Sequence, residues 1–231
     1  MRSLAALALS LALVAPSLAL AEEVPRLLTG DLVLQTSRSS QSAAILAATK
    51  SPYSHIGMVV ERKGKLYVVE AAGPVGYTPL SRWIARGKGG RYTALRVKGL
   101  DDDARAKLAV AAKRYLGRPY DPLFAEGEQR LYCSEFVWAV FRDVGIELTG
   151  WRKVGELDLD ARAVRALMAK RWRKHPACKK EKRLEGCLAK IEDGRILPPG
   201  DLAEDERLEL VFTSFPTPAP TGSGESRVTK P

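Results

Sequence analysis

The stretch Tyr132-Cys133-Ser134-Glu135-Phe136-Val137-Trp138 decides the fold that this sequence predicts. Gly117-Arg118-Pro119 interrupts the chain before it, and a mostly apolar run that ends at Gly145 follows it. These residues predict a buried helix over 134–144, with Cys133 in its first turn. The positive end of the helix dipole favours the thiolate form of a cysteine, and the thiolate is the nucleophile. Cys133 is therefore a candidate nucleophile; the alternative is a small buried apolar residue, a common role for cysteine.

A second segment can supply the base that a thiol nucleophile needs. His55 lies in Tyr53-Ser54-His55-Ile56-Gly57, at the start of a predicted strand over 55–61. A turn at 62–65 leads into a second predicted strand over 66–71, so the two strands are expected to form a hairpin.

Glu70 lies on the second strand of this hairpin, downstream of His55. The turn is centred on residues 63 and 64, so the two side chains are expected roughly opposite each other. Cross-strand neighbours have Cβ atoms about 4.5–5.5 Å apart, close enough for a carboxylate to accept a hydrogen bond from an imidazole. Cys133, His55 and Glu70 thus form a predicted triad of nucleophile, base and orienting acid. The alternative is that His55 is a polar residue at the end of a strand and that Glu70 is an exposed charged residue.

Residues 1–21 have the pattern of a cleavable signal peptide. Arg2 supplies the positive start, Leu4 to Val14 the apolar region, and Ala19-Leu20-Ala21 the cleavage signal. The apolar run is short for a membrane span, so cleavage is expected rather than anchoring. The predicted mature chain begins at Glu22, has no transmembrane segment and is periplasmic or secreted.

The three cysteines fit an exported protein. Export implies an oxidising compartment, where Cys178 and Cys187 are the simplest disulfide pair and Cys133 is left as a free thiol. A metal site that uses His175, Cys178 and Cys187 is the alternative, but it lacks a fourth ligand at close spacing, and structural zinc usually takes four. No metal and no other cofactor are expected.

The positive charge is concentrated in one segment of the chain. The net charge is +10, and Arg165 to Lys190 holds ten Lys or Arg against two Glu. This segment belongs to a predicted basic helical insert at about 158–195, which could attract an anionic surface such as lipid headgroups or acidic cell-wall polymers. A solvated helical insert is the alternative. Nucleic acid is not expected as a partner, because aromatic residues are not interleaved with the basic ones beyond Trp172.

The order of the predicted elements indicates the fold class. Strands cluster early, helices follow, and a strand at about 207–212 closes the domain, which favours an α+β fold over a doubly wound parallel one. The predicted catalytic domain covers 22–215. Residues 216–231 hold Pro, Thr, Ser and Gly with little that is apolar, so a disordered tail is expected.

These motifs together carry a resemblance. A Ser-His-x-Gly strand, a later Glu, and Gly117-Arg118-Pro119-Tyr120-Asp121 before Tyr-Cys-Ser-Glu resemble the circularly permuted NlpC-like, papain-fold cysteine hydrolases of the YiiX/YebB/YaeF type. The cysteine follows the histidine here, as permutation requires. Gly30-Asp31-Leu32-Val33 and Pro199-Gly200-Asp201-Leu202 also look like this group. The resemblance covers about 28–157 well and 196–215 loosely.

The resemblance implies a small antiparallel sheet packed against the nucleophile helix. It implies that Cys133 is the nucleophile, His55 the base and Glu70 the residue that orients His55, in a peptidase or amidase acting through a thioester. Amide bonds in cell-wall peptides or amino-acid conjugates are the expected substrate. Tyr53 and Tyr120 are candidates for lining the cleft, with aromatic packing as the alternative.

Two other functions remain open on the sequence. The basic insert and lipid-acting relatives of the family favour a lipid acyl hydrolase or acyltransferase that uses the same triad. A non-catalytic cell-envelope binding module with a buried thiol is the other alternative. A minimal member of this family is not expected to contain the basic insert. The insert leaves the identity of the substrate open, but it does not affect the assignment of the catalytic residues.

Overall fold

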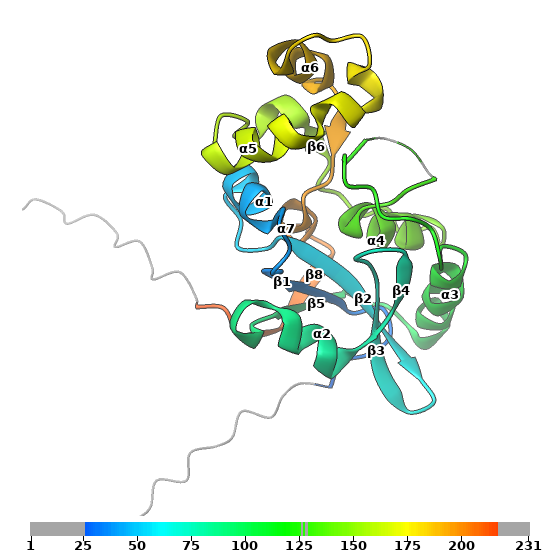
Figure 1. The fold of residues 1–231 in the computed structure, drawn as a ribbon. Helices are drawn as coiled ribbons and strands as arrows, with labels where there is room; N and C mark the ends of the chain where they lie inside the picture. Colours follow the sequence, from blue (N-terminus) through cyan, green and yellow to red (C-terminus); the bar gives the residue numbers. More distant parts are fainter. Residues whose placement is uncertain (1–25, 126, 128, 217–231) are drawn as a thin grey trace, which may run out of the picture.

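A computed structural model of the chain describes residues 26–125, 127 and 129–216 (Figure 1). The predicted signal peptide (1–21) and all but the first residue of the predicted tail (216–231) lie outside the described residues. Among the described residues, no helix is both long enough and apolar enough to cross a membrane.

A six-stranded sheet forms the body of the protein, with the strand order β4-β3-β2-β1-β5-β8. Each neighbouring pair in this sheet is antiparallel. The strands are β1 (Leu32–Gln35), β2 (His55–Arg62), β3 (Lys65–Ala71), β4 (Val75–Pro79), β5 (Thr93–Val97) and β8 (Leu208–Thr213). Two short strands, β6 (Arg152–Lys153) and β7 (Arg195–Ile196), pair with each other elsewhere.

Helices cover both faces of the sheet, which explains why its central strands are apolar on both sides. One face packs against α3 (Asp102–Lys113) and α4 (Cys133–Arg142), in a core that includes Ile56, Met58 and Phe136. The opposite face packs against α2 (Leu80–Arg86) through the buried Trp83. The remaining helices are α1 (Ser42–Thr49), α5 (Arg162–Arg171), α6 (Leu184–Ile191) and the short α7 (Pro199–Leu202).

The β2–β3 hairpin forms at the predicted place. Lys63 has a φ of 50° and Gly64 a φ of 70°. Two successive residues in the left-handed region are typical of the tight two-residue turn whose twist matches that of antiparallel strands. The turn fixes the register of the two strands, with Met58 opposite Val69.

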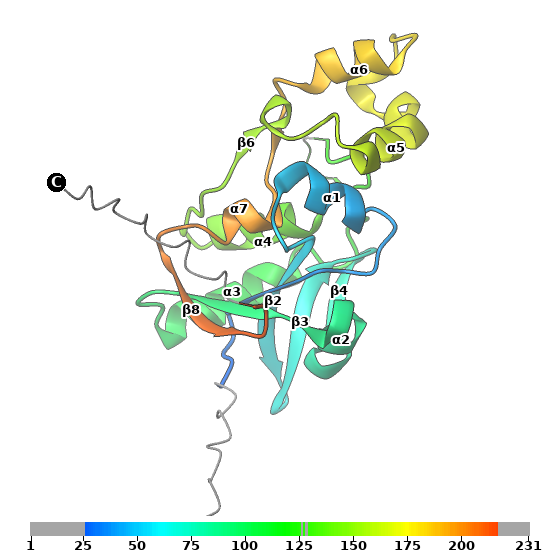
Figure 2. The ribbon, with the colours of Figure 1, turned by 90° about the vertical axis from the view of Figure 1, so that its left-hand side faces the viewer.

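The basic insert forms a compact unit at one end of the molecule, beyond α1 and α4 (Figures 1 and 2). It contains α5, two 3₁₀ turns at 172–174 and 176–178, and α6. The β6–β7 pair joins the chain just before the insert to the chain just after it. The insert has a small core of its own, in which Trp172 and Ile191 pack against the buried Cys178 and Cys187.

Some local features of the fold were not predicted from the sequence. The helix α1 has Gln41 as its N-cap residue, without a side-chain cap. Residues 199–202 form the short helix α7. Strand β4 was not predicted because it follows Gly73-Pro74. Backbone hydrogen bonds of Val75 with Gly117 and Arg118 hold it at the sheet edge.

Candidate active site

Cys133 is the first residue of α4 and is 2 % exposed. The residue before it, Tyr132, has extended backbone angles, so the helix starts at the thiol. Two side chains fix this helix start against the segment at Leu197. Ser134 Oγ donates to the Leu197 carbonyl (2.5 Å), and Tyr132 Oη accepts from the Leu197 N–H (3.0 Å). Ser134 is therefore a structural neighbour of the thiol.

His55 opens strand β2 and is 7 % exposed. Its strand partner on β1 is Gln35, which is fully buried. Neither polar atom of the Gln35 side chain has a hydrogen-bond partner among the described residues. A buried unpartnered amide is costly, and Gln35 is one of several buried side chains with an unpartnered polar atom among the described residues, along with Tyr77, Trp138 and Trp151.

Glu70 meets His55 diagonally across the hairpin. The register places Met58 opposite Val69, and one step further along it Gly57 faces Glu70. His55 and Glu70 were expected roughly opposite each other, and the register offsets them by two residues. Their side chains still meet, with His55 Nε2 2.6 Å from Glu70 Oε2. The missing side chain at Gly57 makes this possible, since a Cβ there would lie 3.2 Å from the Glu70 Cβ.

Three further side chains hold the Glu70 carboxylate. Thr78 Oγ1 donates to Oε1 (2.6 Å), and Trp83 Nε1 donates to Oε2 (2.9 Å). Arg86 also binds Oε2 and brings its Nη2 atom within 3.3 Å of His55 Nε2. Sequence reasoning missed all three, because they come from β4 and α2 and carry no motif of their own.

The pKa values of Cys133 and His55 shift in opposite directions. Burial alone would raise the pKa of the Cys133 thiol, but the charge and hydrogen bond of His55 lower it, with further backbone hydrogen bonds from Ile56 and Ser134. Burial alone would lower the pKa of His55, but Cys133 and Glu70 raise it to about 9. Both directions favour a thiolate–imidazolium pair.

Glu70 stays ionised beside this pair. Burial disfavours its charge, but the hydrogen bond and charge of His55, the charge of Arg86 and the hydrogen bond of Thr78 lower its pKa from 4.5 to about 2. Glu70 therefore supplies a permanent negative charge that holds the imidazole and favours its protonated form.

Tyr120 lies near the thiol, whereas Tyr53 does not line the cavity described below. Burial and the charge of Cys133 both raise the pKa of Tyr120, and Gln41 Nε2 donates to its hydroxyl. Tyr53 Oη is 2.8 Å from Thr93 Oγ1, and Tyr53 lines a separate hollow beside Gly200. Asp121, after Tyr120, accepts the backbone N–H groups of 123 and 125, which fixes the loop before α4.

A cavity of about 360 Å³ opens beside the thiol, with Cys133 and Ser134 on its wall. The insert forms the opposite wall through residues such as Leu167 and Met168. Neither Tyr53 nor Tyr120 lines this cavity.

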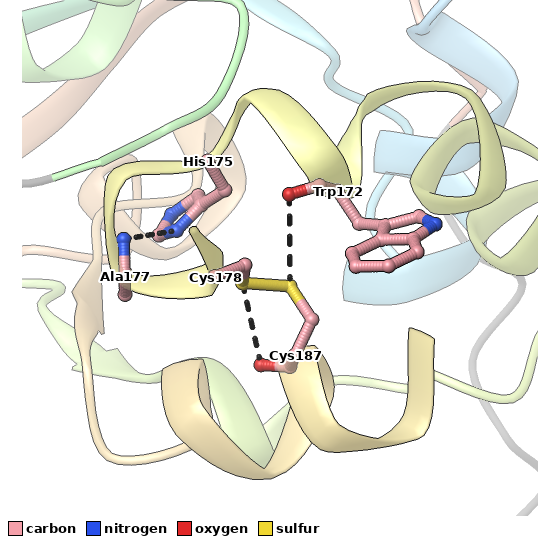
Figure 3. Close-up of a disulfide and its surroundings, with 5 residues drawn as sticks. All are labelled: Trp172, His175, Ala177, Cys178 and Cys187. Carbon is pink, nitrogen blue, oxygen red and sulfur yellow. Dashed lines mark hydrogen bonds between the residues drawn. A yellow bond between two sulfur atoms is a disulfide. The ribbon is translucent and has the colours of Figure 1, made fainter. Parts of the chain in front are cut away.

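Cys178 and Cys187 are bonded to each other in the insert (Figure 3). Their sulfurs are 1.97 Å apart, and Cys133 is the free cysteine. His175 Nδ1 accepts a hydrogen bond from the Ala177 N–H at 3.2 Å. The alternative of a metal site at His175, Cys178 and Cys187 was therefore wrong, because the disulfide occupies both sulfurs.

The arrangement has the parts that acyl transfer by a thiol requires. A nucleophile at a helix N-terminus contacts a histidine, and a carboxylate holds that histidine from its other side. The geometry allows the thiolate to attack a carbonyl carbon and the imidazolium to return a proton to the leaving group.

Comparisons with known proteins show which proteins this chain is similar to. Residues 26–212 match the family model described as "Permuted papain-like amidase enzyme, YaeF/YiiX, C92 family". The uncharacterized protein YiiX of Escherichia coli (strain K12) is 49 % identical over 149 residues, which cover 64 % of this chain and 74 % of that protein. A crystal structure of the metalloprotein yiiX from Escherichia coli O157:H7 is 41 % identical, with a TM-score of 0.73. The match covers 84 % of this chain and 100 % of that one.

Proposed function

Because the chain belongs to the YaeF/YiiX (C92) family of permuted papain-like amidases, we propose that Cys133, His55 and Glu70 carry out its amide hydrolysis as a catalytic triad. The family confirms the predicted α+β, permuted papain-like fold and the predicted class of cysteine amidase or peptidase. The roles of individual residues, the substrate and the location are the proposal.

The observation that carries the proposal is the buried contact between His55 and Glu70 beside a thiol at a helix start. His55 Nε2 is 2.6 Å from Glu70 Oε2, which leaves Nδ1 of the ring for Cys133. This is the arrangement of nucleophile, base and orienting group that recurs in acyl-transfer enzymes on unrelated folds.

In the first half of the reaction, the Cys133 thiolate attacks the carbonyl carbon of an amide. The new S–C bond forms a tetrahedral intermediate whose oxyanion the Cys133 backbone N–H at the start of α4 helps to hold. His55 then gives its proton to the amide nitrogen. The C–N bond breaks, the amine leaves, and a thioester remains on Cys133.

In the second half, water replaces the amine. Neutral His55 takes a proton from the water, and the resulting hydroxide attacks the thioester carbonyl. The S–C bond breaks, the carboxylic acid leaves, and the proton on His55 restores the thiolate–imidazolium pair. Glu70 keeps its charge throughout, because its pKa of about 2 is far below the pH at which the pair forms.

We propose an exported enzyme that acts on peptides or amino-acid conjugates of the cell envelope. The signal-peptide pattern of residues 1–21 and the Cys178–Cys187 disulfide support export. The net positive charge of the insert supports a location beside anionic polymers or headgroups, with an association that weakens as salt is added.

The proposed mechanism contains no metal step. One solved relative is described as a metalloprotein. In the ranges of this chain that the structure describes, no three His, Cys, Asp or Glu residues form a group that could hold a metal ion. The donor set for such a site is thus not found here.

The proposal is tested by incubating the purified protein with a library of peptides and N-acyl amino acids and detecting new amines. Cys133→Ala and His55→Ala are expected to remove amine release while each variant keeps a native circular-dichroism spectrum and a cooperative unfolding transition. A folded Cys133→Ala protein that keeps full activity would contradict the proposal.

A further inference from the structure

The surface around His55 carries positive charge that the proposed mechanism does not use. Residues 71–100 hold six Lys or Arg and no Asp or Glu, and residues 32–60 hold two Lys or Arg and likewise no acid. The acids between these two segments are Glu61, near the far end of β2, and Glu70, whose charge is balanced within the site. The segments that surround the catalytic histidine are therefore basic.

Arg86 brings this positive charge to the active site. Its guanidinium binds the buried Glu70 carboxylate, and its Nη2 atom is 3.3 Å from His55 Nε2. The Arg86 side chain is nevertheless 37 % exposed. Positive charge beside the imidazole therefore reaches the surface of the protein.

The turn after α2 places Lys88 beside the start of β2. The Lys88 N–H donates to the Thr36 carbonyl (2.8 Å), and Thr36 follows Gln35, the strand partner of His55. A Cβ on Gly87 would collide with the side chain of Gln35, so the turn packs closely against β1 here. This packing fixes the backbone of Lys88 near the catalytic histidine.

Arg91 comes just after the same turn and lies beside the segment that leads into His55. Its guanidinium carbon is 5.6 Å from the centre of the Phe215 ring, and Phe215 packs edge-on against Tyr53 with 5.2 Å between the ring centres. Tyr53 lies just before His55 in the chain. The cation–π contact holds the Arg91 side chain on this side of the active site.

Arg38 approaches from the loop after β1. The residue before it, Ser37, donates its N–H to Ser54 Oγ at 2.9 Å, and Ser54 directly precedes His55. The loop that carries Arg38 is thus bonded to the segment that carries the histidine.

Arg38, Lys88 and Arg91 are all exposed, and none of them forms a salt bridge with an acid in the described part of the chain. Together with Arg86 they form what we call the basic rim. Charges of one sign without compensating acids concentrate anions near the surface. A guanidinium group also matches the paired oxygens of a carboxylate or a phosphate. The basic rim therefore suits an anionic ligand group.

The mechanism decides which half of a substrate lies near the basic rim. His55 protonates the amide nitrogen, so the amine half leaves from the His55 side of the bond that is cut. The acyl half extends from the carbonyl carbon in the other direction. Because the basic rim surrounds the segment that carries His55, the amine half is the half that faces it.

We propose that the basic rim binds a carboxylate or a phosphate on the amine half of the substrate, so that the enzyme releases an anionic amine such as an amino acid. The inference rests on the proposed function and names the leaving group of its substrate. A substrate whose amine half is neutral or cationic lacks this contact and is cleaved more slowly.

The test acetylates Cys133 and asks which amine takes up the acetyl group. The thiolate attacks the carbonyl carbon of p-nitrophenyl acetate, the S–C bond forms, the C–O bond breaks, and p-nitrophenol leaves with the proton of His55. An added amine then attacks the thioester and gives a proton to His55, the S–C bond breaks, and an N-acetylamine leaves. This step is the reverse of amide cleavage, so the amine occupies the position of the leaving group.

Two pairs of amines each compare an anionic with a neutral molecule: glycine with glycinamide, and O-phosphoethanolamine with ethanolamine. Formation of each N-acetylamine is followed by mass spectrometry at equal free-base concentration, and the background of the Cys133→Ala protein is subtracted. The anionic member of at least one pair is expected to react faster. A preference in the first pair alone indicates a carboxylate site, and a preference in the second pair alone indicates a phosphate site.

Lys88→Gln/Arg91→Gln removes two charges of the basic rim. The ratio of anionic to neutral product should fall by up to about fivefold for each charge, the upper limit for an exposed ion pair. Lys63→Gln/Lys65→Gln is the matched control, because both lysines are exposed at the hairpin turn and the variant loses the same charge. This turn lies about 25 Å along β2 from His55, beyond the screening length of about 8 Å at physiological salt, so the control should keep the wild-type ratio.

A second variant and a second measurement cover a double variant that does not fold and a thioester that water removes before the amines do. Arg38→Gln, on a different loop, should lower the ratio in the same direction. The ratio of Cys133 alkylation by iodoacetate to that by iodoacetamide compares two reagents that differ in one negative charge and needs no turnover. It should fall in the variants of the basic rim and stay unchanged in the control.

Equal ratios in the wild type, the control and the variants of the basic rim would overturn the inference. Cys133 would still be acetylated in that case, so the proposed function would stand. If p-nitrophenyl acetate leaves no acetyl group on Cys133, the proposed function fails and the inference falls with it. The two failures are thus distinguishable.

Discussion

Glu70 Oε2 lies 2.6 Å from His55 Nε2, although the hairpin register places Glu70 opposite Gly57. The contact is diagonal, and the space left by Gly57 accommodates it. The same carboxylate accepts from Trp83 and Arg86 on α2. The position of His55 therefore depends on the packing of α2 against the hairpin as well as on the hairpin itself.

Glu70→Gln is expected to lower the pKa of His55 from its value of about 9, because the negative charge that favours imidazolium is lost. The alkaline limb of the pH–activity profile should then shift to lower pH, and the Cys133 thiolate should form at higher pH. Glu61→Gln on the exposed end of β2 is the matched control and should leave both unchanged. Identical pH profiles for the two variants would contradict the assigned role of Glu70.

The same substitution should reduce stability in a defined pH range. The pKa of Glu70 is lowered on folding, from 4.5 to about 2. Its stabilising contribution, on the order of 3 kcal/mol, is therefore fully present above pH 4.5 and lost as the pH falls towards 2. Urea titrations at pH 7 and pH 3 should show a smaller difference between wild type and Glu70→Gln at pH 3.

Arg86→Met is expected to act in the opposite direction on His55. Arg86 shares Glu70 Oε2 with His55 and brings a positive charge within 3.3 Å of its Nε2. Without Arg86, the Glu70 carboxylate no longer shares its charge with a guanidinium and stabilises the imidazolium of His55 more strongly. The pKa of His55 then rises, so the alkaline limb of the pH–activity profile should move to higher pH. Arg86→Lys retains a positive charge and should move the limb less. A shift of the Arg86→Met limb to lower pH would show that the arginine supports the imidazolium through geometry instead.

Gly57→Ala should damage both stability and activity. A Cβ at this position would lie 2.4 Å from Val68 Cγ1 and 3.1 Å from the Val69 carbonyl, so β3 would have to move and carry Glu70 with it. Overpacking of this kind costs about 1–3 kcal/mol. Gly76→Ala, on the other strand beside Glu70, is the control, since its nearest contact would be an ordinary 3.7 Å. Melting temperatures and kcat/KM for both variants check this prediction.

Removing the disulfide should loosen the insert and leave the body intact. Cys178 and Cys187 close a short loop and pack with Trp172 and Ile191 in a separate small core. Closing a loop of this length stabilises by roughly 2–3 kcal/mol in the chain-entropy account. The Cys178→Ala/Cys187→Ala variant should show faster amide hydrogen exchange in α6 and unchanged exchange in β1–β3. Equal loss of protection in the sheet would contradict a separately packed insert.

Local signals were sufficient to predict the elements that present the triad. The turn at 62–65 between two predicted strands indicated the hairpin, and Gly117 with the apolar run after Cys133 indicated α4. The antiparallel sheet and its permuted papain-like order came from the resemblance, and the family match confirms it. The structure also places the disulfide between Cys178 and Cys187, the pairing expected from their spacing.

What could not be predicted depends on tertiary packing. Thr78, Trp83 and Arg86 converge on Glu70 only because β4 and α2 fold back over the hairpin. The cavity forms where the insert packs against α1, and Arg171 of the insert bonds there to Gln41, a contact between residues 130 positions apart. Tyr53, expected in the cleft, bonds to Thr93 and lines a different hollow, which hairpin spacing alone could not show.

The central claim is that Cys133 and His55 form a thiolate–imidazolium pair, and the most direct measurement is the rate of Cys133 alkylation by iodoacetamide against pH. Cys133 is the free cysteine, so the reaction reports on one thiol. The account predicts a rate that rises well below the ordinary thiol pKa of about 8.5, and that loses this low-pH reactivity in His55→Ala. A rate that follows an ordinary thiol and is the same in His55→Ala would contradict it.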